Sequence, residues 1–103
     1  RFEQGQGVKR NKKEAARWYR LCAEQGYANA QLVLGSMYDH GEGVKKNYKE
    51  AVQWYRLAAE QGNAKAQFAL GGMYERGQGV KTSKKEAVRW YRIAAEQGLD
   101  KAQ

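Results

Sequence analysis

The pattern of apolar and polar residues predicts helices, and the pattern repeats. The stretch AARWYRLCAEQG at residues 15–26 returns as AVQWYRLAAEQG at 51–62 and as AVRWYRIAAEQG at 87–98. In each copy the apolar residues recur three and four positions apart, so they fall on one side of an α-helix. Residues 8–43 and 44–79 are identical at 23 of 36 aligned positions without a gap, which establishes an internal duplication with a 36-residue period.

Each copy carries signals for the start and the end of its first helix. Asn11, Asn47 and Ser83 each stand three residues before a glutamate, which is the spacing of an N-terminal capping box. A glycine follows each stretch at residues 26, 62 and 98, and glycine readily takes the left-handed conformation that ends a helix. The first helix of each repeat is therefore predicted to lie between these two signals.

A second helix is predicted in each complete repeat, from about Ala28 to His40 and from Ala64 to Arg76, with Gly41 and Gly77 as the stops. Each repeat is thus expected to be a helical hairpin within a single domain covering residues 1–103. We divide this domain into the end of a preceding repeat (1–7), two repeats (8–43 and 44–79) and a truncated repeat (80–103). A chain that lacks an initiator Met and starts inside a repeat is typical of a fragment.

The helical wheel also predicts the core. Gly35 and Gly71 are expected where a neighbouring helix comes close, and the tryptophan rings are expected to fill the space between hairpins. Because one hairpin cannot bury both of its apolar sides, the copies must stack into a solenoid. In the first repeat the predicted core positions, with equivalents in the other copies, are Ala15, Trp18, Tyr19, Cys22, Ala23, Ala30, Leu34, Met37 and Tyr38.

The 36-residue period, the motifs A-x-x-W-Y-R-x-A-A-E-Q-G and A-x-A-Q-x-x-L-G-x-M-Y, and the loop G-x-G-V together resemble the Sel-one-like repeats, which are relatives of the tetratricopeptide repeats. This resemblance covers essentially the whole chain. It implies an all-α solenoid of antiparallel helix pairs with a right-handed superhelix, in which the first helix of each pair lines the concave side. It also implies a non-enzymatic adaptor that holds protein complexes together, in bacterial envelope and host-interaction systems or in eukaryotic membrane-associated quality control.

Composition adds a preference for acidic partners. The 103 residues include 19 Lys and Arg against 11 Asp and Glu, giving a formal net charge of +8. A single cysteine excludes an internal disulfide framework, and no apolar run is long enough to span a membrane.

The charge concentrates on the side of the first helix opposite the predicted core. We expect these positions to line the concave face and to bind an acidic peptide or protein. The alternatives are an ordinary solvated helix face and a nucleic-acid-binding face, the latter disfavoured because the aromatic rings are assigned to the core. The candidate partner-binding residues, eight of nine of which are cationic, are Lys13, Arg17, Arg20, Lys49, Gln53, Arg56, Lys85, Arg89 and Arg92.

Little in the sequence points to catalysis. His40 has Gln4 and Arg76 as counterparts in the other copies, which favours a surface position at a helix end. Cys22 aligns with Ala58 and Ala94, which favours a small buried filler. The glycine loops lack the preceding strand and the third glycine of a dinucleotide site, and no residues have metal-ligand spacing. We therefore expect neither an enzyme nor a cofactor or metal site.

The truncated last repeat suggests an uncovered end. Because it lacks a complete second helix, we expect the face carrying Trp90, Ile93 and Leu99 to be less covered than its counterparts. End-to-end self-association is then expected in concentrated samples.

Overall fold

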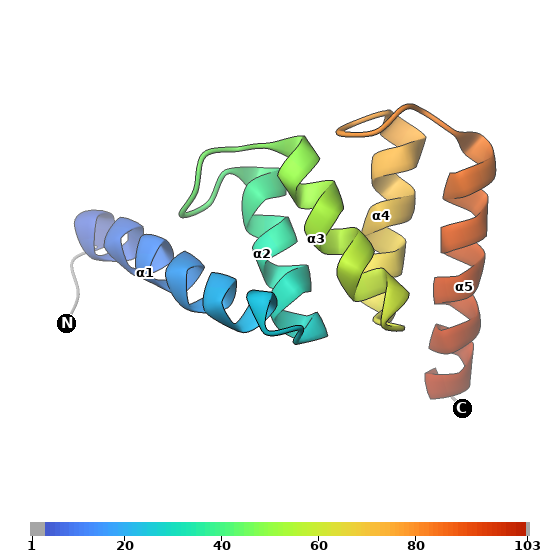
Figure 1. Ribbon diagram of the computed structural model, residues 1–103, viewed down its shortest axis with the longest axis horizontal. Helices are drawn as coiled ribbons and strands as arrows, with labels where there is room; N and C mark the ends of the chain where they lie inside the picture. Colours follow the sequence, from blue (N-terminus) through green and yellow to red (C-terminus); the bar gives the residue numbers. More distant parts are fainter. Residues whose placement is uncertain (1–3, 103) are drawn as a thin grey trace.

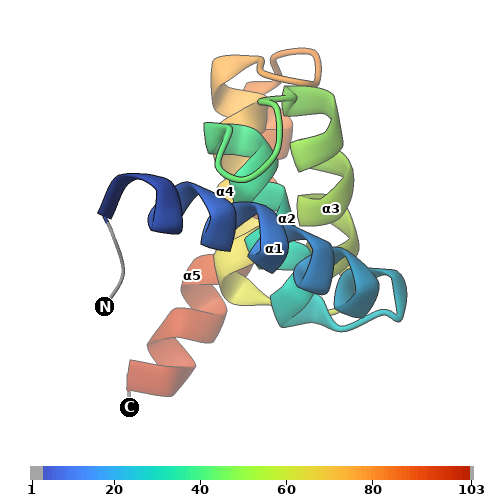
Figure 2. The ribbon, with the colours of Figure 1, turned by 90° about the vertical axis from the view of Figure 1, so that its left-hand side faces the viewer.

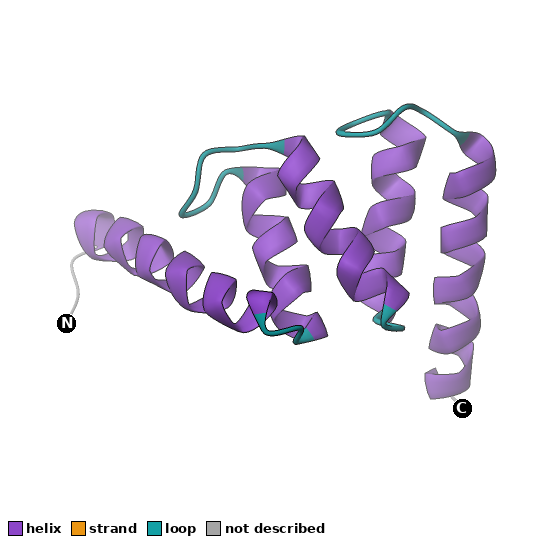
Figure 3. Ribbon diagram, viewed as in Figure 1, coloured by secondary structure: helices purple, strands orange, loops and turns teal. Residues whose placement is uncertain are grey.

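The part of the chain that the structure describes forms five α-helices, which follow one another along the molecule (Figure 1). The computed structural model describes the backbone of residues 4–102 and the side chains of residues 11–98. Within that part of the chain all regular structure is helical (Figure 3), which confirms the predicted all-α repeat fold. The helices are α1 (Gln4–Glu24), α2 (Ala28–His40), α3 (Tyr48–Glu60), α4 (Ala64–Arg76) and α5 (Lys84–Ala102).

Each helix packs mainly on its neighbours in the chain. Helix α2 lies against α1 and α3, and α4 lies against α3 and α5, with the more extensive contacts between a second helix and the first helix of the next repeat. Viewed from the α1 end in Figure 2, α1 lies across the axes of α3 and α4, so the helix direction changes along the stack. The result is an extended array of 44 × 33 × 25 Å.

Most of the predicted helix boundaries are confirmed. The Asn47 side chain accepts a hydrogen bond of 3.0 Å from the amide of Glu50, and Ser83 Oγ accepts one of 3.1 Å from the amide of Glu86. The second helices match their predicted spans, and Gly41 ends α2 with φ of 69°. Backbone chemistry at helix ends therefore accounts for these boundaries.

Two predicted boundaries are wrong. Asn11 lies inside α1, which begins at Gln4, and Gly98 lies inside α5, which continues to Ala102. The loop that precedes α3 packs closely on the preceding first helix. A Cβ added at Gly43 in this loop would collide with the carbonyl oxygen of Lys12. Within residues 4–102, no second helix packs on α1 before Val8 and none packs on α5 after Gly98. Without such contacts the helix extends through these residues, because their local preference is helical.

Helix α3 has the most complete core because it has a second helix on each side. Its residues Ala51, Val52, Tyr55, Ala58 and Ala59 are at most 4% exposed. They form one cluster with the next second helix and α5, and the predicted core position Ala95 on α5 is instead exposed. The second-helix residues of the core, all buried as predicted, are Ala30, Leu34, Met37, Ala66, Leu70 and Met73.

The predicted close approach at the two helical glycines is confirmed. A Cβ at Gly35 would lie 2.8 Å from Cδ1 of Tyr55, and one at Gly71 would lie 2.9 Å from Cδ1 of Tyr91. The Tyr55 ring lies over Gly35, and its hydroxyl donates a 3.0 Å hydrogen bond to Asp39. Only a residue without a side chain lets the ring lie flat on the neighbouring helix.

Buried glutamines join consecutive hairpins, a feature that the sequence reasoning missed. Gln31 is 3% exposed and donates to the Ala23 carbonyl at 3.1 Å, while its own side-chain oxygen accepts from Gln61 at 2.9 Å. Gln67 repeats this arrangement with Ala59 and Gln97. Each buried amide is thereby satisfied, as a polar group in a core must be. The sequence signal for this arrangement is the recurrence of glutamine 36 residues apart, at Gln31 and Gln67 and at Gln61 and Gln97.

The three equivalent tryptophans differ in exposure, which corrects the prediction that all of them fill the core. Trp90 is 6% exposed and Trp54 is half-buried, but Trp18 is 67% exposed. Trp54 and Trp90 each pack on the hairpin that precedes them, in the clusters that contain Leu34 and Leu70. Trp18 has no complete hairpin before it in this chain. Its indole therefore stays in solvent.

The same geometry corrects the expectation for the last repeat. The side of α5 that carries Trp90 is covered by α4, and Ile93 also packs on that core. The uncovered apolar residues are others: Val88 of α5 is 52% exposed, and Phe68 of α4, whose ring centroid lies 5.1 Å from that of Tyr91, is 64% exposed. The side chain of Leu99 lies outside the described residues.

These tryptophans provide a test of stacking within one chain. Trp90→Ala should lower the free energy of unfolding by about 3–5 kcal/mol, because it leaves a cavity between α4 and α5. Trp18→Ala should lower it by less than about 1 kcal/mol, because the ring is largely hydrated. Urea unfolding followed by circular dichroism measures both values. Equal losses would contradict the packing described here.

The buried Tyr55 hydroxyl predicts a loss of stability in alkali. Burial, reinforced by the Asp39 carboxylate, raises the pKa of Tyr55 well above its ordinary value of 10.0. The unfolded chain then ionises first, so the stability due to the neutral hydroxyl is present below about pH 10 and is lost as the pH rises further. When the free energy of unfolding is measured at pH values from about 8 to about 11, it should decline less in Tyr55→Phe than in the wild type.

A matched control is Tyr19→Phe, which changes the equivalent residue of the first repeat. Tyr19 is 37% exposed, so this variant should keep the wild-type decline. The same decline in all three proteins would mean that Tyr55 is not the group responsible.

Candidate functional site

The nine predicted binding positions lie on α1, α3 and α5, on the side away from the core. Arg20 and Arg56 are half-buried, and the other seven are exposed: Lys13, Arg17, Lys49, Gln53, Lys85, Arg89 and Arg92. Solvent therefore reaches a row of these residues on each first helix. We call these the basic rows.

An arginine in each complete repeat is fixed against the second helix of its own hairpin. Arg20 donates through Nη2 to the hydroxyl of Tyr38 and lies 5.7 Å above its ring centroid. Arg56 donates to the hydroxyl of Tyr74 at 2.7 Å and lies 5.6 Å above that ring. The rings and hydroxyls thus limit the motion of these guanidinium groups, whose other N–H groups can still donate to a partner.

The arginines of α5 are held differently. Arg89 lies 4.7 Å above the ring of Trp90, and its Nε is 4.0 Å from the carboxylate of Glu86. Arg92 is the equivalent of Arg20 and Arg56, but no equivalent tyrosine follows it in this chain. The third basic row is therefore less constrained than the first two.

The basic rows belong to helices that do not pack extensively on one another. Each first helix contacts second helices, so α2 separates α1 from α3 and α4 separates α3 from α5 along the array (Figure 1). A partner that touches more than one row must therefore extend along the stack. An extended peptide or a long protein edge satisfies this requirement.

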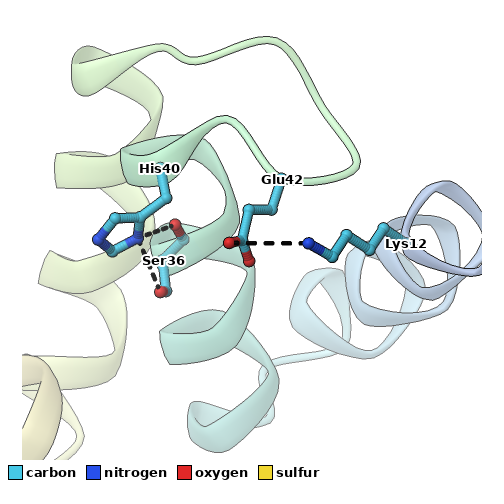
Figure 4. A network of polar contacts seen from close by, with 4 residues as sticks. All are labelled: Lys12, Ser36, His40 and Glu42. Carbon is cyan, nitrogen blue, oxygen red and sulfur yellow. Dashed lines mark hydrogen bonds and ion pairs between the residues drawn. The ribbon is translucent and has the colours of Figure 1, made fainter. Parts of the chain in front are cut away.

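A groove separates α1 from the loop that connects α2 to α3. One end is lined by Lys12, Lys13 and residues 41–45, and the other end adds Ala16 and Leu21 from α1. The Lys12 ammonium lies 3.9 Å from the carboxylate of Glu42, so one ion pair joins the helix to the loop across the groove (Figure 4). This ion pair is exposed and stabilises the loop only slightly.

His40 and Cys22, the residues considered above for catalysis, each contact neighbouring groups of the fold. His40 is exposed at the end of α2, and its Nδ1 is 2.9 Å from the Ser36 carbonyl oxygen of the same helix (Figure 4). Cys22 is half-buried and packs beside Ala23 and Leu34. Among the described residues, no group of three His, Cys, Asp or Glu side chains could hold a metal ion. In the same part of the chain, every helix is too short or too polar to cross a membrane.

Two features of this surface were missed from the sequence. The arginine–tyrosine pairs join residues 18 apart, and their signal was the recurrence of Tyr38 and Tyr74 at the same distance from Arg20 and Arg56. The groove depends on how a loop meets the preceding hairpin. Helical periodicity within one helix contains no information about that contact.

Comparison with known proteins identifies the family of the repeat. The Sel1 repeat family model matches residues 1–27, 28–63 and 64–99, with the same 36-residue period counted from the second helix of each hairpin. In this phase each repeat pairs a second helix with the following first helix, which are the helices in most extensive contact. No curated protein sequence matches the chain.

Solved structures agree with this match. A protective antigen present in uropathogenic Escherichia coli strains, displaying an SLR fold, is 54% identical with a TM-score of 0.78, covering 80% of this chain and 18% of that one. A Sel1 repeat protein from Oxalobacter formigenes is 50% identical with a TM-score of 0.79, covering 82% and 35%. Helicobacter pylori cysteine rich protein B is 28% identical with a TM-score of 0.79, covering 84% and 65%. The chain thus spans less than two thirds of each of these proteins.

Proposed function

Because the chain belongs to the Sel1 repeat family, whose members are typically non-catalytic scaffolds for protein–protein interaction, we propose that it binds an acidic peptide or protein segment along its basic rows. The observation that carries this proposal is the presence of six exposed and two half-buried cations on the first helices, on the side that the core does not use. We further propose that this side is the concave face of the array.

Charge supports an acidic partner. The formal net charge is +8, and the ion pairs among the described residues are only Lys12–Glu42, Arg20–Glu24 and Arg89–Glu86, each 3.9–4.0 Å long. Most cations of the basic rows are therefore uncompensated within the described chain. Such a surface attracts carboxylates and repels cationic proteins.

Fixed arginines add to this argument. The tyrosine contacts of Arg20 and Arg56 restrict side chains that would otherwise lose rotamer entropy on binding. A guanidinium group held in place can then meet a carboxylate with two parallel hydrogen bonds. The first two basic rows are accordingly the stronger candidates for carboxylate binding.

Nucleic acid is the alternative ligand for these charges. Single-stranded nucleic acid is held by aromatic rings that stack on its bases along a basic groove. Among residues 11–98, three aromatic residues are strongly exposed, namely Trp18, Tyr27 and Phe68. Trp18 lies on the opposite side of α1 from the first basic row, and the other two lie on second helices or at their start. This separation of aromatic rings from cations favours the peptide.

The test reverses one charge in each basic row. Lys13→Glu, Lys49→Glu and Lys85→Glu change exposed side chains without breaking an arginine–tyrosine pair. Combined, they should weaken the binding of a fluorescein-labelled polyglutamate peptide on the order of tenfold, measured by fluorescence anisotropy at low salt. The helical circular dichroism signal should not change.

The control combines Lys46→Glu, Lys65→Glu and Lys81→Glu, which changes the net charge equally at exposed lysines outside the basic rows. It should weaken binding much less. Equal weakening by both variants would mean that net charge, and not the basic rows, attracts the peptide. Low-micromolar binding of generic single-stranded or duplex nucleic acid with a steep salt dependence would favour the alternative.

We also propose that copies associate through their uncovered ends when concentrated. Trp18 at one end and Phe68 at the other are each more than 60% exposed, and such apolar surface favours contact between molecules. Sedimentation velocity over a range of concentrations should show reversible association, which Trp18→Ser and Phe68→Ser reduce. A monomer at all concentrations would refute this proposal.

A further inference from the structure

The groove beside α1 has an apolar floor within a basic rim. At the end nearer Arg20 its volume is about 530 Å³, and its apolar walls are Ala16, Leu21 and Val44. Leu21 is 54% exposed, although it lies next to the apolar loop residue Val44. An aliphatic surface of this kind gains free energy when another aliphatic group covers it.

The three repeats differ at the residue that forms this floor. Position 16 is alanine in the first repeat, whereas the equivalent residues are Val52 and Val88. Val52 is 4% exposed and reaches the following loop, since a Cβ at Gly79 would lie 2.8 Å from its Cγ2. Ala16 is also 4% exposed, but it lacks the methyl groups with which Val52 reaches the loop. Val88 is 52% exposed, and within the described residues the space beside it is lined by residues of α5.

The rim of the groove carries opposite charge to an acidic peptide. Lys13, Arg17 and Arg20 border one end, and Lys45 borders the other. Glu42 also lies on the rim, but it is paired with Lys12. The cations along this rim therefore outnumber the carboxylates, and the excess lies directly beside the apolar floor.

We propose that this groove binds one aliphatic side chain of an acidic peptide, with carboxylates on either side of that residue held by the rim cations. This inference rests on the proposed acidic partner and assigns the first repeat a specificity that the others lack. Charge attracts the peptide to every basic row, while burial of the aliphatic side chain against Leu21 and Val44, beside the buried Ala16, fixes its register.

The experiment uses two fluorescein-labelled peptides made of glutamate, one with a central leucine and one with glycine in its place. The wild-type chain should bind the leucine peptide about tenfold more tightly, the amount expected for partial burial of one leucine side chain. Ala16→Val should abolish this preference while leaving the affinity for the glycine peptide unchanged. The variant introduces the residue that the second repeat already accommodates at this position.

A second pair of variants keeps the test independent of Ala16. Leu21→Gln should reduce the preference for leucine, because it replaces an apolar wall at an exposed helical position. Leu57→Gln is the matched control, since Leu57 is the equivalent residue beside the space that Val52 fills and is 45% exposed. It should leave the preference intact.

The outcomes separate this inference from the proposed function. Equal affinity for both peptides, lowered for both by charge reversal in the basic rows, would overturn the groove and support the acidic partner. A leucine preference that persists in both Ala16→Val and Leu21→Gln would also overturn the groove. Failure of both peptides to bind would overturn the proposed function and the inference with it.

Discussion

The structure depends on one packing requirement: each first helix has an apolar side wider than a single partner can cover. Helix α3 meets this requirement with α2 on one flank and α4 on the other, and its core residues are almost completely buried. Within the described chain α1 and α5 each have one such neighbour. Trp18 and Val88 are exposed there, whereas their equivalents in α3 are the half-buried Trp54 and the buried Val52. Burial in this protein is therefore set by position in the array as much as by residue type.

The helices and their period could be predicted from the sequence because they depend on local chemistry. Capping side chains such as Asn47, the glycine stops of the second helices, and the small residues at Gly35 and Gly71 all act within one helix or across one contact. The failures share a cause. Asn11 and Gly98 carry the correct signals, but a cap or a glycine only permits a boundary, and within residues 4–102 no further hairpin packs against either position.

The candidate site was predictable in part for the same reason. Periodicity identified which residues of each first helix face away from the core, and the structure exposes most of them. It did not identify Tyr38 as the partner of Arg20, because that pair joins two helices. Nor did it single out Ala16, whose effect appears only when the following loop is placed beside it. In a repeat array the small differences between copies are best interpreted after the shared packing is known.

Stacking also explains how a small domain presents so much charge. The core uses the flanks of the first helices that meet second helices, so the remaining side is free to carry cations without loss of burial. Hydrogen bonds from Arg20 and Arg56 to tyrosines then link this outer side to the hairpins beneath it. An extended surface that can carry charge without loss of burial is a consequence of the fold.

Native-state hydrogen exchange, resolved residue by residue, tests the packing requirement most directly. If burial depends on a second helix at each flank, the amides of α3 should exchange most slowly, and protection should fall toward both α1 and α5. Equal protection in the three first helices would contradict this account, because each would then be stable without its neighbours.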